Sequence, residues 1–195
     1  MLNKRKIVRD LEDSLAQIED GIKLFKEGKH YAYKGVSTQL RLLLCDTTTK
    51  PLLLKIFSTV AFHPLKSEVF RQGLPEKDRD SLVFVLNGTA SIHPNNSSLS
   101  DMFEKRGTPM MLEEWLNQNI LPKTSIRDLI LSTTNKEAVH SDSDYDEILK
   151  ISKSINLGID EIQGHYIVGI GDYVREIIKD ILTQKGTEFE AWKEK

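Results

Sequence analysis

Two long stretches of the chain repeat apolar residues at every third or fourth position, and this spacing restricts the fold more than any other feature. The first covers residues 4–27 and ends at Gly28, and the second covers residues 158–185. Such spacing places the apolar side chains on one face of an α-helix, which must be buried against other helices. A third helix is expected over residues 31–46. The sequence therefore predicts a mainly α fold, a helical bundle.

The last of these predicted helices contains three glycines, Gly164, Gly169 and Gly171. Glycine lowers helix propensity, because it loses more backbone freedom than other residues when a helix forms. Several glycines in one amphipathic helix therefore predict either close packing against a neighbouring helix or a kink.

Between residues 74 and 107 the helical spacing of apolar residues gives way to polar segments and two short apolar runs. The apolar run at 82–86 is followed by Asn87-Gly88 and then by a second short run at 89–93. Asn-Gly between two such runs is typical of a type I′ turn, which joins the strands of a β-hairpin. Two strands are too few to fold alone. We therefore expect one domain over residues 1–195, with a hairpin-containing insertion at about 74–107.

The composition is that of an ordinary globular protein, with 29% charged and 39% hydrophobic residues. A formal net charge of −2 gives no general attraction to nucleic acid or membranes, although it permits a local basic patch. Cys45 is the only cysteine, so no intramolecular disulfide forms, and we expect it to be a buried small side chain. No signal peptide and no apolar run of about 18 residues is recognisable, which predicts a cytoplasmic protein without a membrane span.

Sequence motifs for cofactors and metals are missing from the chain. It has no glycine-rich phosphate loop, no HExxH, no CxxC and no GxSxG. Asp142, Asp144 and Asp146 resemble the start of an EF-hand loop, but the sixth position is Glu147 and the twelfth is Lys153. We interpret these acids as helix caps, and we predict neither a cofactor nor a metal site.

A compact polar segment follows the predicted helix that starts at Ser125. Ser125 is suited to cap that helix, and Asp128 stands three residues later, as in a capping box. Asn135, His140 and Asp142 then follow before a second helix, which is predicted to start near Asp144. These three side chains are candidates for ligand binding, because they are polar and lie between two helix ends.

Two further candidates come from the predicted helices themselves. Arg41 belongs to a strongly apolar helix, where an unpaired charge is costly. It is interpreted either as part of a structural salt bridge or helix cap, or as an anion-binding residue that faces the His140 pocket. His165 lies on the last helix and is expected to face the same segment, where histidines suit phosphate binding or general acid–base chemistry.

The segment from Thr134 to His140 resembles the motif of the HEPN superfamily of small helical bundles, many of which are RNases or nucleotide-binding partners in toxin systems. Their motif is an arginine directly followed by a polar residue such as asparagine, with a histidine four to six residues after the arginine. Asn135 and His140 match the asparagine and the histidine, whereas Thr134 stands in place of the arginine. In active members this arginine helps to bind the scissile phosphate.

This resemblance implies a non-catalytic HEPN-like domain that binds a nucleotide, an RNA or a protein partner. Threonine cannot supply the missing positive charge. The alternatives are a HEPN-type RNase in which Arg41 or Arg127 takes the place of the missing arginine, and a purely structural or interaction protein. A homodimer is also possible, because Met110, Met111 and Trp115 are candidates for an exposed apolar patch.

Overall fold

The computed structural model describes residues 4–65, 109–121, 124–134, 153 and 159–183. Of these residues 76% are helical, so the prediction of a mainly α bundle is confirmed. The predicted hairpin at 82–93, its insertion and the helix expected near Asp144 lie outside the described residues.

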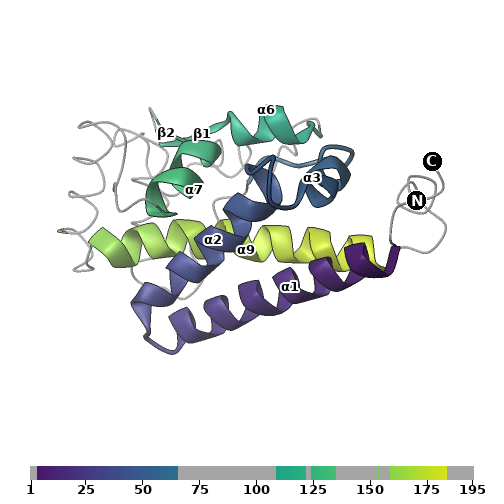
Figure 1. The fold of residues 1–195 in the computed structure, drawn as a ribbon. Helices are drawn as coiled ribbons and strands as arrows, with labels where there is room; N and C mark the ends of the chain where they lie inside the picture. The colour runs from purple at the N-terminus through teal and green to yellow at the C-terminus, as the bar shows by residue number, and fades with distance from the viewer. Residues whose placement is uncertain (1–3, 66–108, 122–123, 135–152, 154–158, 184–195) are drawn as a thin grey trace.

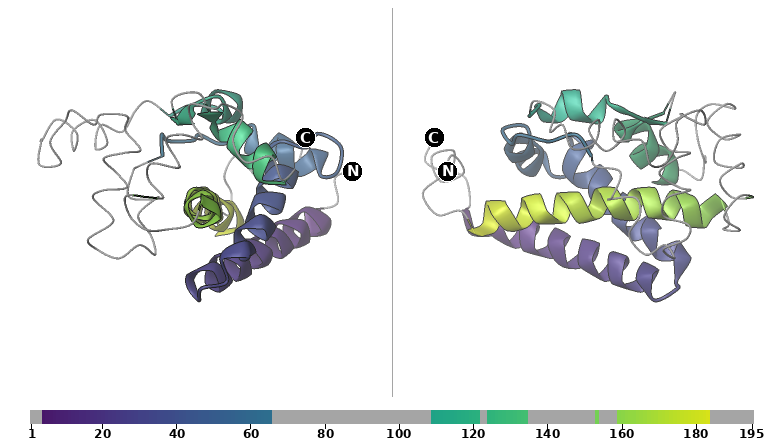
Figure 2. Two further views of the ribbon diagram at one scale, coloured as in Figure 1. Left: turned by 90° about the vertical axis from the view of Figure 1, so that its left-hand side faces the viewer. Right: turned by 180° about the vertical axis from the view of Figure 1, so that it is seen from behind.

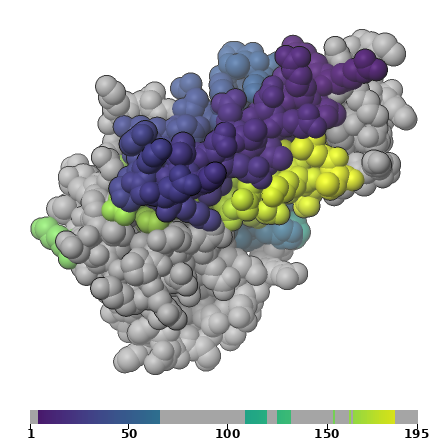
Figure 3. Space-filling model, turned by 90° about the horizontal axis from the view of Figure 1, so that it is seen from below, coloured from purple at the N-terminus to yellow at the C-terminus, as the bar shows by residue number. Residues whose placement is uncertain are grey.

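Three helices form the centre of the molecule (Figure 1). They are α1 (Lys4–Lys26), α2 (Tyr33–Leu44) and α9 (Ile159–Thr183), and the short 3-10 turn η1 (His30–Ala32) connects the first two. The helices α1 and α9 run antiparallel and side by side, and α2 crosses them, as the views in Figures 1 and 2 agree. From below, α1 lies along α9 on the surface of the bundle (Figure 3).

The C-terminus of α1 shows why the predicted boundary was correct. Gly28 has a φ of +96°, a backbone conformation that glycine adopts without steric cost. The N–H groups of Gly28 and Lys29 donate to the carbonyl oxygens of Phe25 and Leu24 at 3.1 and 3.0 Å. These bonds satisfy carbonyls that the end of a helix would otherwise leave unpaired.

The shorter elements lie beyond α2. They are α3 (Pro51–Phe57), α6 (Leu112–Leu116), the antiparallel pair β1 (Asn119–Leu121) and β2 (Thr124–Ser125), and α7 (Ile126–Thr134). Ser125 caps α7 as expected, because its Oγ accepts the N–H of Asp128 at 3.1 Å.

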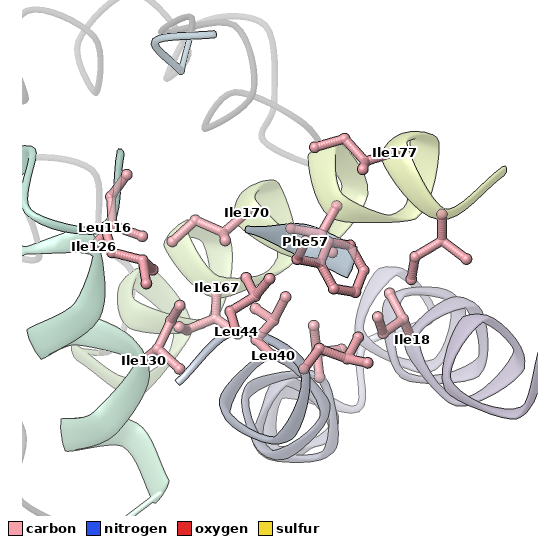
Figure 4. Close-up of a cluster of buried hydrophobic side chains, with 14 of the residues drawn as sticks. Ile18, Leu40, Leu44, Phe57, Leu116, Ile126, Ile130, Ile167, Ile170 and Ile177 are labelled. Carbon is pink, nitrogen blue, oxygen red and sulfur yellow. The ribbon is translucent and has the colours of Figure 1, made fainter. Parts of the chain in front are cut away.

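One hydrophobic core joins the helices α1, α2, α3, α6, α7 and α9, and it contains apolar residues of the stripes that define the predicted helices (Figure 4). Leu40 and Leu44 of α2 face Ile130 of α7 and Ile167 of α9, and Phe57 of α3 closes one side. All five side chains are almost completely buried. The core therefore positions α2 between the long helices and the α6–α7 segment.

Glycines allow α2 to approach both long helices at one point. A Cβ added at Gly21 of α1 would lie 2.6 Å from Val36 Cγ2, and a Cβ added at Gly171 of α9 would lie 2.5 Å from Val36 Cγ1. A Cβ at Gly164 would meet the rings of Phe25 and Tyr33. The predicted close packing of glycines in the last helix is thus confirmed at Gly164 and Gly171.

A cluster of three aromatic rings joins the segment after α3 to α6 and α9. The ring centroids of Phe62 and Trp115 are 4.7 Å apart, and those of Trp115 and Tyr173 are 5.7 Å apart. The Trp115 indole N–H donates to the His63 carbonyl oxygen at 3.1 Å, and the His63 N–H donates to the Tyr173 hydroxyl oxygen at 2.8 Å. These hydrogen bonds satisfy the polar atoms that burial of the cluster would otherwise leave unpaired.

This cluster corrects one expectation about dimerisation. Trp115 is completely buried, so it cannot belong to an exposed apolar patch. Met110 is half-buried and forms a β-bridge with Phe62, whereas Met111 is 51% exposed. Of the three residues proposed for the patch, only Met111 is therefore strongly exposed.

Candidate anion-binding site

Arg41 lies in the last turn of α2 and is half-buried. Its Nε is buried and has no hydrogen-bond partner within the described part of the chain. The structure shows no ion pair between Arg41 and any carboxylate in that same part. The structural salt bridge that was one interpretation of Arg41 is therefore not present among the described residues.

The end of α2 is held by the chain that follows Arg41. The N–H groups of Cys45 and Asp46 both donate to the Arg41 carbonyl oxygen, at 3.0 and 2.8 Å. The Asp46 carboxylate in turn accepts bonds from the backbone N–H and hydroxyl groups of Thr48 and Thr49. These bonds favour the ionised carboxylate and keep the pKa of Asp46 well below its usual range. The turn that positions Arg41 is thus closed by local hydrogen bonds.

Arg127 lies in the first turn of α7, and its partners come from the α6 region. Its Nη2 lies 2.6 Å from Glu113 Oε2, and its Nη1 donates to Asn117 Oδ1 at 3.2 Å. A cation at the start of a helix is unfavourable next to the helix dipole, and Glu113 offsets this cost. The Glu113 side chain is 73% exposed and the Arg127 side chain is 30% exposed, so this ion pair lies at the surface.

Cys45 lies between the two arginines. Burial raises the pKa of its thiol to about 11, while the nearby charges of Arg127 and Arg41 act in the opposite direction. The thiol is therefore protonated at neutral pH and is a poor nucleophile. Cys45 is thus within electrostatic reach of two arginines that belong to different helices.

We name the group formed by Arg41, Cys45, Glu113, Asn117 and Arg127 the arginine corner. It contains two permanent positive charges and one carboxylate, so it is locally positive although the whole chain carries a formal charge of −2. Guanidinium groups bind phosphate and carboxylate oxygens through paired hydrogen bonds. The arginine corner is thus suited to bind an anion.

The packing of α2 on α7 determines which ends of these helices meet. The Ser37 hydroxyl donates to the Ile130 carbonyl oxygen at 3.0 Å, and Cys45, directly after the end of α2, lies near Arg127 at the start of α7. The two helices therefore run antiparallel. Arg41 therefore lies toward the start of α7.

His165 lies elsewhere in the bundle, at the junction of α9 with the end of α1. It is 6% exposed, and its ring meets the ring of Phe25 edge-on at a centroid distance of 4.9 Å. On the same side of the bundle, His30 also contacts Phe25 and lies 3.6 Å from the Glu161 carboxylate. Phe25 also contacts Tyr33 at the start of α2, so His165 lies toward the other end of α2 from Arg41.

The remaining candidates, Asn135, His140 and Asp142, lie outside the described residues. Three members of the arginine corner, Cys45, Glu113 and Asn117, were not predicted as site residues, and Arg127 was considered only as a substitute for the missing HEPN arginine. No short motif marks this group, because residues 41–45 and 113–127 are far apart in the sequence. These two segments come together in space only because α2 packs against α7.

In comparisons with known proteins, no family model, no characterised protein and no solved structure matches the chain. The HEPN resemblance therefore rests on the residues of the motif alone. Within the described segments, no helix has the length and apolar character needed to cross a membrane.

The raised pKa of Cys45 gives a direct prediction about its reactivity. At about pH 8 the folded protein should react with iodoacetamide about 100-fold more slowly than the urea-unfolded protein, since two pKa units correspond to about a hundredfold less thiolate. Cys45 is the only cysteine, so mass spectrometry follows it without interference. Equal rates in the two states would contradict the burial of this thiol.

Proposed function

We propose that this protein is a non-catalytic, HEPN-like domain that binds the phosphate of a nucleotide or an RNA through Arg41 and Arg127. The observation that supports this proposal is the state of Arg41. Its half-buried guanidinium has no carboxylate partner within the described residues, and a second arginine stands close by. A charge in this position is costly without a counterion. A bound phosphate would supply that counterion.

The two arginines have different roles in this proposal. Arg41 contacts the phosphate without first losing a partner. Arg127 is held in place by Glu113 and Asn117. Because the Glu113 side chain is mostly exposed, its ion pair contributes little to stability, and a phosphate oxygen competes with it at small cost.

Binding without catalysis is favoured by the chemistry of the arginine corner. Hydrolysis of RNA needs a group that exchanges a proton near neutral pH. The pKa of Cys45 is raised, so its thiol stays protonated, and the Glu113 carboxylate is held in an ion pair with Arg127. The motif that suggests the HEPN family also has Thr134 in the position of its arginine.

Replacement of Arg41 by alanine should weaken the binding of the preferred ligand by about tenfold. A tenfold loss of affinity corresponds to about 1.4 kcal/mol, close to the lower end of the free-energy range for a hydrogen bond to a charged group. We expect the lower end because the arginine corner is partly exposed to solvent. The measurement is fluorescence anisotropy with labelled single-stranded RNA, with ATP and AMP as competitors. Arg9→Ala is the matched control, because it removes the same charge from an exposed position on α1.

The Arg9→Ala protein should bind almost as well as the wild type. Arg41→Lys should recover only part of the affinity, since lysine keeps the charge but lacks the planar pair of donors. Equal losses for Arg9→Ala and Arg41→Ala would show general electrostatic attraction instead of a site. Binding of neither nucleotide nor RNA would favour a protein partner or a purely structural role.

A further inference from the structure

A cleft lies between α9 and the segment formed by the end of α3 and the residues that follow it. It has a volume of about 400 Å³, within the range of about 300–1,000 Å³ that is typical of small-molecule sites. Its apolar lining includes Ile56, Val60, Ile177 and Ile181. None of the residues of the arginine corner lines this cleft.

The charged side chains of the cleft are both acidic, Glu176 and Asp180. The Glu176 carboxylate lies 3.3 Å from Arg175 and 3.9 Å from Lys179, so these cations already compensate it in part. For the Asp180 carboxylate, the structure shows no cation partner across the described residues. Asp180 is therefore the charge that remains available to a ligand.

The wall of the cleft is held in place by hydrogen bonds and ring contacts. Its lining residues Tyr173 and His63 are joined by the bond from the His63 N–H to the Tyr173 hydroxyl oxygen. The Trp115 indole donates to the His63 carbonyl oxygen and packs on the Tyr173 ring. The Tyr173 hydroxyl accepts this hydrogen bond and keeps its own proton for donation, because burial raises the pKa of Tyr173. The cleft is thus preformed by the aromatic cluster.

We propose that this cleft binds a small amphipathic amine, with its ammonium group at Asp180 and its apolar body against Ile56, Ile177 and Ile181. The apolar lining supplies burial, and the free carboxylate selects a positive charge over a neutral or negative one. This site does not depend on the phosphate-binding function, because it uses other residues and the opposite charge.

The test compares three probes with the same apolar body: phenylbutylamine, the corresponding alcohol and the corresponding carboxylate. Affinities are measured by ligand-observed NMR titration at low ionic strength. The amine should bind about fivefold more tightly than the alcohol, which corresponds to about 1 kcal/mol for an exposed ion pair. The carboxylate should bind more weakly than the alcohol, and added salt should reduce the preference for the amine.

Asp180→Asn should abolish the preference for the amine and leave the affinity for the alcohol unchanged. Asp20→Asn is the matched control, since Asp20 is an exposed acid on α1 and does not line the cleft. It should behave as the wild type. Equal binding of amine and alcohol to the wild type, an unchanged preference in Asp180→Asn, or no saturable amine binding would each overturn the proposal.

Discussion

Replacing Trp115 by alanine should lower the free energy of unfolding by about 3–5 kcal/mol, the range measured for large aromatic side chains in protein cores. The side chain is completely buried between Phe62 and Tyr173. Its loss leaves a cavity and also leaves the His63 carbonyl oxygen without its indole donor. Urea denaturation followed by circular dichroism measures the change, because it does not depend on tryptophan fluorescence.

Trp115→Phe separates the two contributions. Phenylalanine keeps an aromatic ring between Phe62 and Tyr173 but lacks the N–H that donates to His63. We expect this variant to lose clearly less stability than Trp115→Ala. A loss below about 1 kcal/mol for Trp115→Ala would mean that the aromatic cluster does not contribute to the core as the structure shows.

Replacing Gly171 by alanine should also destabilise the protein, by about 1–3 kcal/mol. The new Cβ would lie 2.5 Å from Val36 Cγ1, and a valine side chain has little rotamer freedom with which to move away. Alanine gains up to about 1 kcal/mol of helix propensity over glycine, which is not enough to compensate for such a contact. The midpoint of urea denaturation measures the net effect.

Gly35→Ala is the matched control for this substitution. Gly35 is also in a helix, but a Cβ there meets no atom within 4 Å. Only the gain in helix propensity remains, so this variant should be more stable than the wild type by about 0.5–1 kcal/mol. Combining Gly171→Ala with Val36→Ala should cost less than the sum of the single changes, since the second removes the clashing methyl groups. Equal effects of the two glycine substitutions would contradict the close contact between α2 and α9.

The long helices could be predicted because each has a continuous stripe of apolar residues spaced three or four positions apart, which is the period of an α-helix. The first was expected over 4–27 and is Lys4–Lys26, and the last was expected over 158–185 and is Ile159–Thr183. Residues 51–66, which contain α3, show neither a clean helical period nor a clean alternating period, so the sequence alone does not distinguish a helix from a strand there. The β1–β2 pair was missed, since strands of two and three residues are too short to show an alternating pattern.

The candidate site was only partly predictable, for a physical reason. Arg41 was noticed because a charge in an apolar helix needs an explanation. Its neighbours Cys45, Glu113 and Arg127 depend on how α2 packs on α7, and helical periodicity gives the buried face of a helix but not its partner. His165 was expected to face the segment Asn135–His140, which lies outside the described residues, and its ring packs against Phe25.

The most direct test of the proposed function is an NMR titration that observes the Nε–H signals of the arginine side chains. The protein is labelled with nitrogen-15, and Arg41→Lys and Arg127→Lys assign the two signals. Addition of AMP or a short RNA should shift the Arg41 and Arg127 signals together and leave that of the exposed Arg9 unchanged. If every phosphate ligand left the Arg41 signal in place while other signals moved, the phosphate would bind elsewhere and the arginine corner would not be its site.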